Sequence, residues 1–424
     1  MPGEGHGGEP IQAGDAALPA ALREALGAWV ARGRVGPLVQ WLERELDPDG
    51  VPRRLAVGDW PAAFRGLAGA VAARPEEWPV RLDAVVEPWF GALLRFSRPD
   101  GSPAFGSGAS GTDIRGLFRG WAERLAEPGL LTVVDWWFPP ARPGRHAAPP
   151  LPADARPDRP LAILRANWAK DGDFLAVDHR ATGPGSLVEF FAHGRPWLGP
   201  EWRSASPAMA TRARPTLWES QSSADVAEWS FRVGRAQVTR TAVLLRGRRL
   251  ALLAEQWDGP GDPGAWQLSL APGVESLPRA ERPELSLRAP RSRVSPRALP
   301  IGLSSHDAPS GHGRLCQEGR SLVLAQPAAG SRCWRPLLLS WDPRRDRLEP
   351  RWQALMVTED RRVCGPDEAC ALRVAWKQDE SLVIYRSLAA TATRAFLGHQ
   401  TRARFLVGLF NAEGNVEPLL KVEE

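Results

Sequence analysis

The sequence predicts an α+β multidomain protein, with a short N-terminal α-helical domain followed by a large antiparallel β-sandwich. Three observations predict this class. Apolar residues recur at helical spacing in the first third of the chain, a proline-rich stretch follows, and the apolar pattern then changes to a period of two. Because 424 residues exceed what one hydrophobic core usually holds, we expect a disordered tail, a helical domain, a linker and a sandwich domain at residues 1–14, 15–138, 139–160 and 161–424.

The helical domain is predicted from several amphipathic segments. Asp59 is placed to cap one helix at its N-terminus, and Pro88 is expected to kink or split the next helix. A further helix is expected to begin at Thr112 and to end before Gly129, and the apolar run over 130–137 is typical of a strand. Together these segments predict a short antiparallel array of helices.

The sandwich domain is predicted from short strands with alternating apolar residues. The sequence AKDG at 169–172 marks one hairpin turn, and His193 with Gly194 marks the next. A stretch rich in Pro and Arg over 278–300 interrupts the pattern, and strands then resume to the end of the chain. Many short antiparallel strands over this length predict two sheets packed face to face.

The composition excludes several functional classes. The net charge is +5, but only three of the 54 cationic residues are lysines, and the arginines are mostly interleaved with acids, so we predict no binding of nucleic acid. Nineteen tryptophans could stack on sugar rings, although filling of the core is the preferred explanation for most of them. No apolar run is long enough to span a membrane, and no secretory signal is visible, which predicts a cytoplasmic protein.

Short motifs give no cofactor or metal site. The glycines of GSGASG at 106–111 match a dinucleotide-binding pattern, but no strand directly precedes them, so a loop is predicted. His306 and His312 lie in a loop and are not expected to bind a metal. The four cysteines lack zinc-site spacing; Cys364 and Cys370 either form a disulfide in an oxidising compartment or remain thiols, as do Cys316 and Cys333.

Three stretches resemble the heparinase II/III-like polysaccharide lyases, which join an (α/α) toroid to an antiparallel β-sandwich. LLRFSRPDGSPAFGSG at 93–108 is similar to a late segment of that toroid. LAVDHRATGPGSLVEFFAHGRPWLGP at 175–200 is similar to the first sandwich hairpins, and VTRTAVLLRGRRLALLAEQWDG at 238–259 to the strand pair that follows. The resemblance implies a helical domain that is a fragment of a toroid, and a role in polysaccharide metabolism.

The departures from that family concern its proton-transfer groups. Such a lyase needs a base, a group that neutralises the uronate carboxylate and an acid for the leaving oxygen. The family supplies histidine from a loop that corresponds to RATGPGS at 180–186 and tyrosine from its toroid. Here that loop has no histidine, and the helical domain has no tyrosine. The resemblance therefore implies a degenerate member.

We accordingly predict a non-catalytic protein that binds carbohydrate or has a structural role in polysaccharide metabolism. The alternatives are an active polysaccharide lyase that eliminates across a uronic acid, and a protein-interaction module. For the lyase, the candidate catalytic residues are His179 and Tyr385; for binding of polysaccharide or oligosaccharide, the candidates are Arg180, Arg195 and Trp197. We expect His193 to serve a tight turn. No cofactor is predicted, and the oligomeric state is left open.

Overall fold

The computed structural model describes residues 18–106, 114–141, 147–155, 160–180, 185–204, 211–279, 282–305, 313–328, 330–377 and 380–423. The chain forms two compact units, one ending at Pro150 and the other beginning at Leu151. Thr112, the glycines of the GSGASG motif beyond Gly106, His306 and His312 lie outside the described residues.

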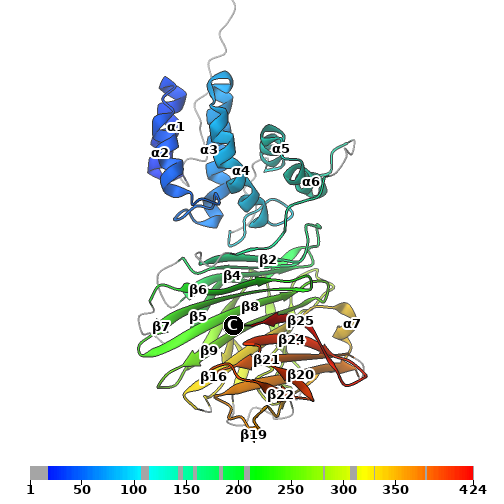
Figure 1. Cartoon of the computed structure of the whole chain (residues 1–424). Helices are drawn as coiled ribbons and strands as arrows, with labels where there is room; N and C mark the ends of the chain where they lie inside the picture. Colours follow the sequence, from blue (N-terminus) through cyan, green and yellow to red (C-terminus); the bar gives the residue numbers. More distant parts are fainter. Residues whose placement is uncertain are drawn as a thin grey trace, which may run out of the picture. The chain divides into compact units, whose positions relative to one another are not determined.

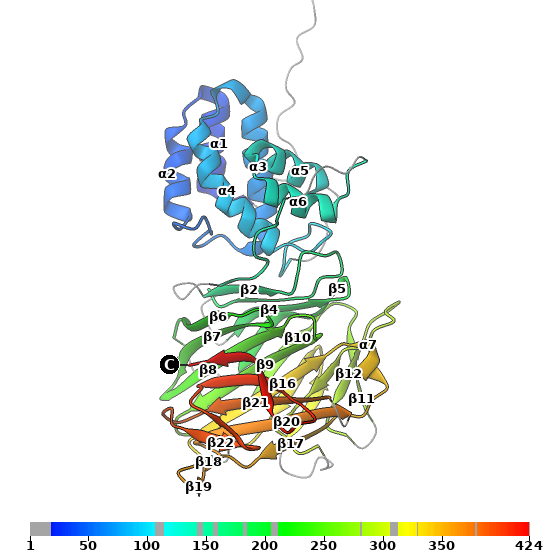
Figure 2. The same cartoon turned by 45° about the vertical axis from the view of Figure 1, so that its right-hand side comes forward.

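The first unit is α-helical. Its helices are α1 (Ala20–Arg32), α2 (Gly36–Glu45), α3 (Trp60–Ala73), α4 (Val80–Arg95), α5 (Ile114–Leu125) and α6 (Pro128–Trp137), with short 3-10 helices η2 (Val57–Asp59) and η3 (Pro75–Glu77). Figure 2 shows α1 to α4 side by side. Aromatic rings fill the space between the helices: the ring of Phe64 on α3 lies 4.6 Å from that of Trp89 on α4 and 5.5 Å from that of Trp121 on α5.

Two local predictions for this unit are wrong, and a third is wrong in part. Asp59 does precede α3, but its side chain makes no capping hydrogen bond. Pro88 does not split α4, which runs from Val80 to Arg95, so of the two predicted effects only a kink stays a prediction. The predicted strand over 130–137 is α6, so Gly129 lies in the first turn of a helix. The apolar residues of this run fit a helix or a strand equally well. Pro128 suits the first position of a helix, and the carboxylate of Glu127 accepts from the backbone N–H groups of Gly129 and Leu130. These two features favour the start of a helix here.

The second unit consists of antiparallel sheets (Figure 1). Sheet 1 has the order β1-β2-β3-β4-β5-β10-β15-β14, with strands Asp154–Ala155, Leu161–Arg165, Phe174–Asp178, Gly185–Ala192, Arg195–Ser204, Ala265–Leu270, Ser321–Ala325 and Arg314–Glu318. Sheet 2 has the order β11-β12-β13-β16-β9-β8-β7-β6, with strands Glu275–Pro278, Leu285–Arg288, Arg297–Leu299, Arg332–Ser340, Leu250–Asp258, Ala236–Leu245, Ala224–Val233 and Arg214–Ser220.

Two smaller sheets come from the last part of the chain. Sheet 3 has the order β17-β20-β21-β24-β25, with strands Arg351–Leu355, Ala369–Lys377, Glu380–Ser387, Phe405–Phe410 and Val416–Val422. Sheet 4 has the order β19-β18-β22-β23, with strands Arg362–Val363, Thr358–Glu359, Arg394–Phe396 and His399–Thr401. One short helix, α7 (Pro343–Asp346), follows β16.

The cores between the sheets define their stacking. One apolar cluster joins residues of sheets 1 and 2, a second joins sheets 2 and 3, and a third joins sheets 3 and 4. Sheet 2 is therefore buried on both faces, which explains the unbroken apolar runs in β8 and β9. The prediction of two sheets was incomplete, because alternation along a strand does not tell which sheet will cover each face.

The predicted turn at His193 and Gly194 is confirmed. His193 and Gly194 form the turn between β4 and β5, both with positive φ, of 50° and 74°. The interruption of the strand pattern predicted over 278–300 is wrong in part, because this stretch contains β12 and β13. In both units together, all the tryptophans except Trp136 and Trp218 are buried, so packing accounts for nearly all of them. Within the described part of the chain, no helix is long and apolar enough to cross a membrane.

Candidate functional site

His179 directly follows β3, and its ring is buried between sheets 1 and 2. The side chain is 2% exposed, and the ring centroid lies 4.6 Å from that of Trp229 and 6.4 Å from that of Trp202. The backbone N–H of His179 donates to the carbonyl of Pro160 at 2.7 Å. The predicted catalytic histidine thus lies within the core of the β-rich unit.

A buried polar network extends from His179 across sheet 2. Nδ1 of His179 is hydrogen-bonded to Oγ of Ser186, and Nη1 of Arg240 donates to the same oxygen at 2.6 Å. Nε of Arg240 donates to Oε1 of Glu255 at 2.9 Å, and Nη2 of Arg335 donates to Oε2 of Glu255 at 3.0 Å. Arg240, Glu255 and Arg335 are register partners on β8, β9 and β16, so strand pairing places the three charges in a row.

The surroundings of His179 disfavour its charged form. Nδ1 is hydrogen-bonded to the Ser186 hydroxyl, whose oxygen also accepts from Arg240. Nε2 has no hydrogen-bond partner among the described residues. Burial, and then the positive charge of Arg240, hold the pKa of His179 well below its usual range. A general base must reach the proton that it removes, whereas this ring is enclosed in the core.

The predicted binding residues lie at two places on sheet 1. Arg180 forms a two-point ion pair with Asp178, at 3.0 Å from Nε and 2.7 Å from Nη2, and its side chain is 12% exposed. At the other end of β4, the guanidinium of Arg195 lies 5.3 Å from the ring centroid of Trp197 and donates to the carbonyl of Pro290. Trp197 is fully buried, and its indole N–H donates to the carbonyl of Ala192 at 3.0 Å.

Tyr385 is not close to His179. It lies on β21 in the core between sheets 3 and 4, where its ring stacks on Phe396 at 5.2 Å and its hydroxyl accepts from Arg394 at 3.4 Å. His179 lies between sheets 1 and 2, so sheets 2 and 3 separate the two predicted catalytic residues. Both roles stay predictions, and the structure does not place the two side chains in one site.

A pocket of about 750 Å³ opens at the end of β6 and β7, and we call it the arginine pocket. Arg212, Arg214 and Arg232 line it, each exposed and without an ion pair among the described residues. No acidic residue is among its described lining residues, and Phe231 forms a buried part of its wall. The guanidinium of Arg240, which belongs to the His179 network, lies 5.0 Å from the centroid of the Phe231 ring.

Sequence reasoning missed these three arginines. The signal is the stretch over 202–218, which contains Arg203, Arg212 and Arg214 and no Asp or Glu. Arg232 joins them because the backbone N–H of Thr211 donates to its carbonyl at 3.0 Å, which extends the pairing of β6 with β7.

Neither a metal site nor a disulfide is formed by the residues that the structure describes. No group of three or more His, Cys, Asp and Glu residues within them is arranged to hold a metal ion. All four cysteines are free thiols, including the pair in the CGPDEAC loop. Burial raises the pKa of Cys370 to about 12, so that thiol stays protonated at neutral pH.

The fold defines a two-part α+β protein in which a helical unit precedes a stack of antiparallel sheets. Among solved structures it is similar to heparan sulfate lyase HepC from Pedobacter heparinus, with a TM-score of 0.65 and 13% identity over 87% of this chain. It is also similar to a structure of heparinase III, with a TM-score of 0.61 and 8% identity over 83% of this chain. The chain covers 65% and 62% of those two proteins.

The likeness is one of fold, as the resemblance in the sequence implied. No family model matches the chain, and no curated protein matches it. The fold class of helical domain followed by antiparallel sheets is confirmed, and the helical unit with its six described α-helices is the part that the resemblance identified as a toroid fragment.

Proposed function

We propose that this protein is a non-catalytic member of the heparinase fold that binds an acidic polysaccharide through the arginine pocket. The observation that carries the proposal is the gathering of Arg212, Arg214 and Arg232 around one pocket, where these three exposed arginines have no acidic partner among the described residues. Guanidinium groups bind carboxylates and sulfates through charged hydrogen bonds of fixed geometry. The similarity in fold to heparan sulfate lyases favours a polysaccharide as the source of those anions.

Charge recognition fits this molecule better than stacking on sugar faces. Only Trp136 and Trp218 among the tryptophans are not buried, and neither lines the arginine pocket. Stacking would need exposed aromatic rings beside the arginines. The affinity should therefore depend on the charge of the polysaccharide and fall with added salt.

The binding test is calorimetric titration with heparan sulfate oligosaccharides and with a neutral oligosaccharide of similar length. We expect binding of the acidic oligosaccharides alone, and a loss of about tenfold or more in affinity when Arg212, Arg214 and Arg232 are all changed to Gln. The matched control changes Arg288, Arg291 and Arg293, three exposed arginines of the same unit, to Gln. Equal losses in both triple variants would refute the pocket, because they would reflect net charge alone.

The catalytic alternative is tested by the ultraviolet absorbance of the unsaturated uronate that a lyase releases. We expect no product from a panel of uronic-acid polysaccharides, because the neutral ring of His179 is enclosed and Tyr385 lies in a different core. Product formation that is lost in His179→Gln, with folding checked by circular dichroism, would establish the lyase instead.

A further inference from the structure

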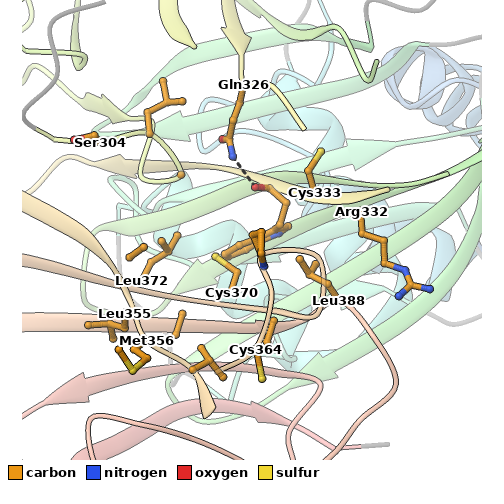
Figure 3. Close-up of a pocket in the computed structure, with 18 of the residues that line it drawn as sticks. Ser304, Gln326, Arg332, Cys333, Leu355, Met356, Cys364, Cys370, Leu372 and Leu388 are labelled. Atoms are coloured by element: carbon orange, nitrogen blue, oxygen red, sulfur yellow. Dashed lines mark hydrogen bonds between the residues drawn. The ribbon is translucent and has the colours of Figure 1, made fainter. Parts of the chain in front are cut away.

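A second pocket in the β-rich unit, of about 630 Å³, is lined by residues of β16 in sheet 2 and of β17 and β20 in sheet 3. We call it the apolar pocket. Figure 3 shows Leu355, Leu372 and Leu388 among the side chains that line it. Sites for small molecules typically have volumes of about 300–1,000 Å³, with mostly apolar walls and a few polar groups. The apolar pocket therefore has the size and the walls of such a site.

Part of the border of this pocket is apolar and open to solvent. Met356 and Val363 line it and are 68% and 56% exposed, and few other large apolar side chains among the described residues are exposed to this extent. Burial raises the pKa values of the Cys364 and Cys370 thiols in its wall, so both stay neutral and behave as small apolar groups. An apolar ligand would cover border side chains that now contact water, which the hydrophobic effect favours.

One cation accompanies these apolar walls. Arg332 is the only charged residue among the described residues that line the pocket. It is the first residue of β16, and Trp334, two residues further along, packs into the core between sheets 2 and 3. Side chains two residues apart in a strand share a face of the sheet, so Arg332 lies on the face of sheet 2 that is directed toward sheet 3. Figure 3 shows Arg332 on one side of the pocket, and Leu355 and Met356 on the other.

The guanidinium of Arg332 is accessible and only partly engaged. The side chain is 37% exposed, and its Nε donates to Oδ2 of Asp258 at 3.1 Å. Asp258, the register partner of Arg332 on β9, is 43% exposed, so water screens its charge. The two Nη groups make no hydrogen bond to any residue that the structure describes. Two parallel N–H donors on one edge of a guanidinium match the two oxygens of a carboxylate.

We propose that the apolar pocket binds an amphipathic monocarboxylate of the medium-chain fatty acid class, with its carboxylate on the Nη groups of Arg332 and its chain directed toward Leu355 and Met356. The carboxylate is favoured because the described lining residues include this one cation and no acidic residue. The chain is favoured by the apolar walls and border. This proposal is independent of polysaccharide binding, because the two pockets share no lining residue.

The test follows the methionine methyl signals of the full chain, labelled with ¹³C at those methyl groups, while octanoate is added. The sequence has three methionines, Met1, Met209 and Met356, so the signals are few, and Met356→Leu identifies the one at the pocket. We expect that signal to move in a saturable way. 1-Octanol, which has the same chain without the charge, should bind about tenfold more weakly, and octylammonium and acetate more weakly still. This comparison of ligands uses the unaltered protein, so it does not depend on the folding of any variant.

The matched variants are Arg332→Gln, which removes the cation, and Arg203→Gln, which changes an exposed arginine of β5 that is paired with Glu201. We expect octanoate to bind about tenfold more weakly to Arg332→Gln, and 1-octanol to bind it unchanged. Arg203→Gln and the triple variant of the arginine pocket should both bind octanoate as the unaltered protein does, so failure of the polysaccharide site and failure of this proposal are distinguishable.

Three results would each overturn the proposal. The first is the absence of a saturable shift of the Met356 signal with octanoate. The second is equal affinity for octanoate and octylammonium, because the site would then not recognise charge. The third is an octanoate affinity that is unchanged in Arg332→Gln, or that falls there only as far as the affinity for 1-octanol does.

Discussion

The substitution Glu255→Gln should destabilise the β-rich unit strongly. The Glu255 carboxylate is fully buried and accepts from Arg240 at 2.9 Å, from Arg335 at 3.0 Å and from the Ser204 hydroxyl at 2.8 Å. The two arginine side chains are 1% and 0% exposed, so water cannot replace the lost charge. Removing one partner of a buried pair costs about 3–5 kcal/mol, and here two guanidinium groups lose the same carboxylate. We therefore expect about 4–5 kcal/mol, a large share of the 5–15 kcal/mol that stabilises a typical domain.

The assay is urea unfolding of the full chain, followed by tryptophan fluorescence and circular dichroism. The control is Glu201→Gln on β5, whose partner Arg203 is 58% exposed and whose loss should change the free energy of unfolding by less than about 0.5 kcal/mol. Adding Arg335→Met to Glu255→Gln should recover part of the loss, because it removes one of the two unpaired charges. A value for Glu255→Gln within about 1 kcal/mol of the unaltered protein would refute this account of the network.

Three further predictions concern stability. The pKa of His179 is held below its unfolded value of about 6.5, so the unfolded chain binds a proton first as the pH falls. Stability should therefore fall below about pH 6.5, by up to about 1.4 kcal/mol per pH unit. His179→Gln should flatten that slope in urea unfolding, and an equal slope in both proteins would contradict the prediction. Gly50→Ala should destabilise the helical unit by about 2 kcal/mol, because φ of Gly50 is +74° and the new Cβ would lie 2.5 Å from that of Pro88. Gly27→Ala in α1, where the new Cβ meets no atom within 4 Å, should stabilise the unit by about 0.5–1 kcal/mol. Thermal melts in which Gly27→Ala unfolds at a lower temperature than Gly50→Ala would refute this prediction. Glu228→Gln should lower the free energy of unfolding in urea by less than Glu255→Gln does, because Arg404, one partner of Glu228, is 31% exposed and water can solvate its charge. A larger loss for Glu228→Gln would show that solvation of Arg404 does not offset the missing carboxylate.

The local structure of the β-rich unit could be predicted wherever two signals agreed. Around His193, strands with a period of two flank a residue type that tolerates positive φ, and the structure has a tight turn there. Over 130–137 the signals did not agree, because valine and threonine favour strands while Pro128 and the Glu127 carboxylate start a helix. The carboxylate's contribution depends on where the chain turns, which composition does not reveal.

The stacking of the sheets and the buried charges depend on long-range pairing. Arg240 and Glu255 are equidistant from the turn that joins β8 to β9, so their pairing could have been read from that predicted hairpin. Arg335 could not, because β16 pairs with β9 only after a long intervening segment. The arginine pocket needs the same kind of information, since Arg232 approaches Arg212 only through the pairing of β7 with the segment before β6.

Both faces of sheet 2 hold buried charges that are already paired. Each face of sheet 2 carries a buried glutamate between two arginines: Glu255 toward sheet 1, and Glu228, which accepts from Arg386 and Arg404, toward sheet 3. Burial would raise the pKa of Glu228, but the two arginines outweigh it and lower that pKa, so the carboxylate stays charged and paired.

Proton transfer needs a group that is both accessible and able to change its charge near the working pH. His179 and these two glutamates are enclosed in hydrogen-bonded networks, whereas the described residues that line the arginine pocket include no carboxylate, histidine or tyrosine. The arginine pocket therefore offers guanidinium groups, which stay charged near neutral pH and suit the recognition of anions.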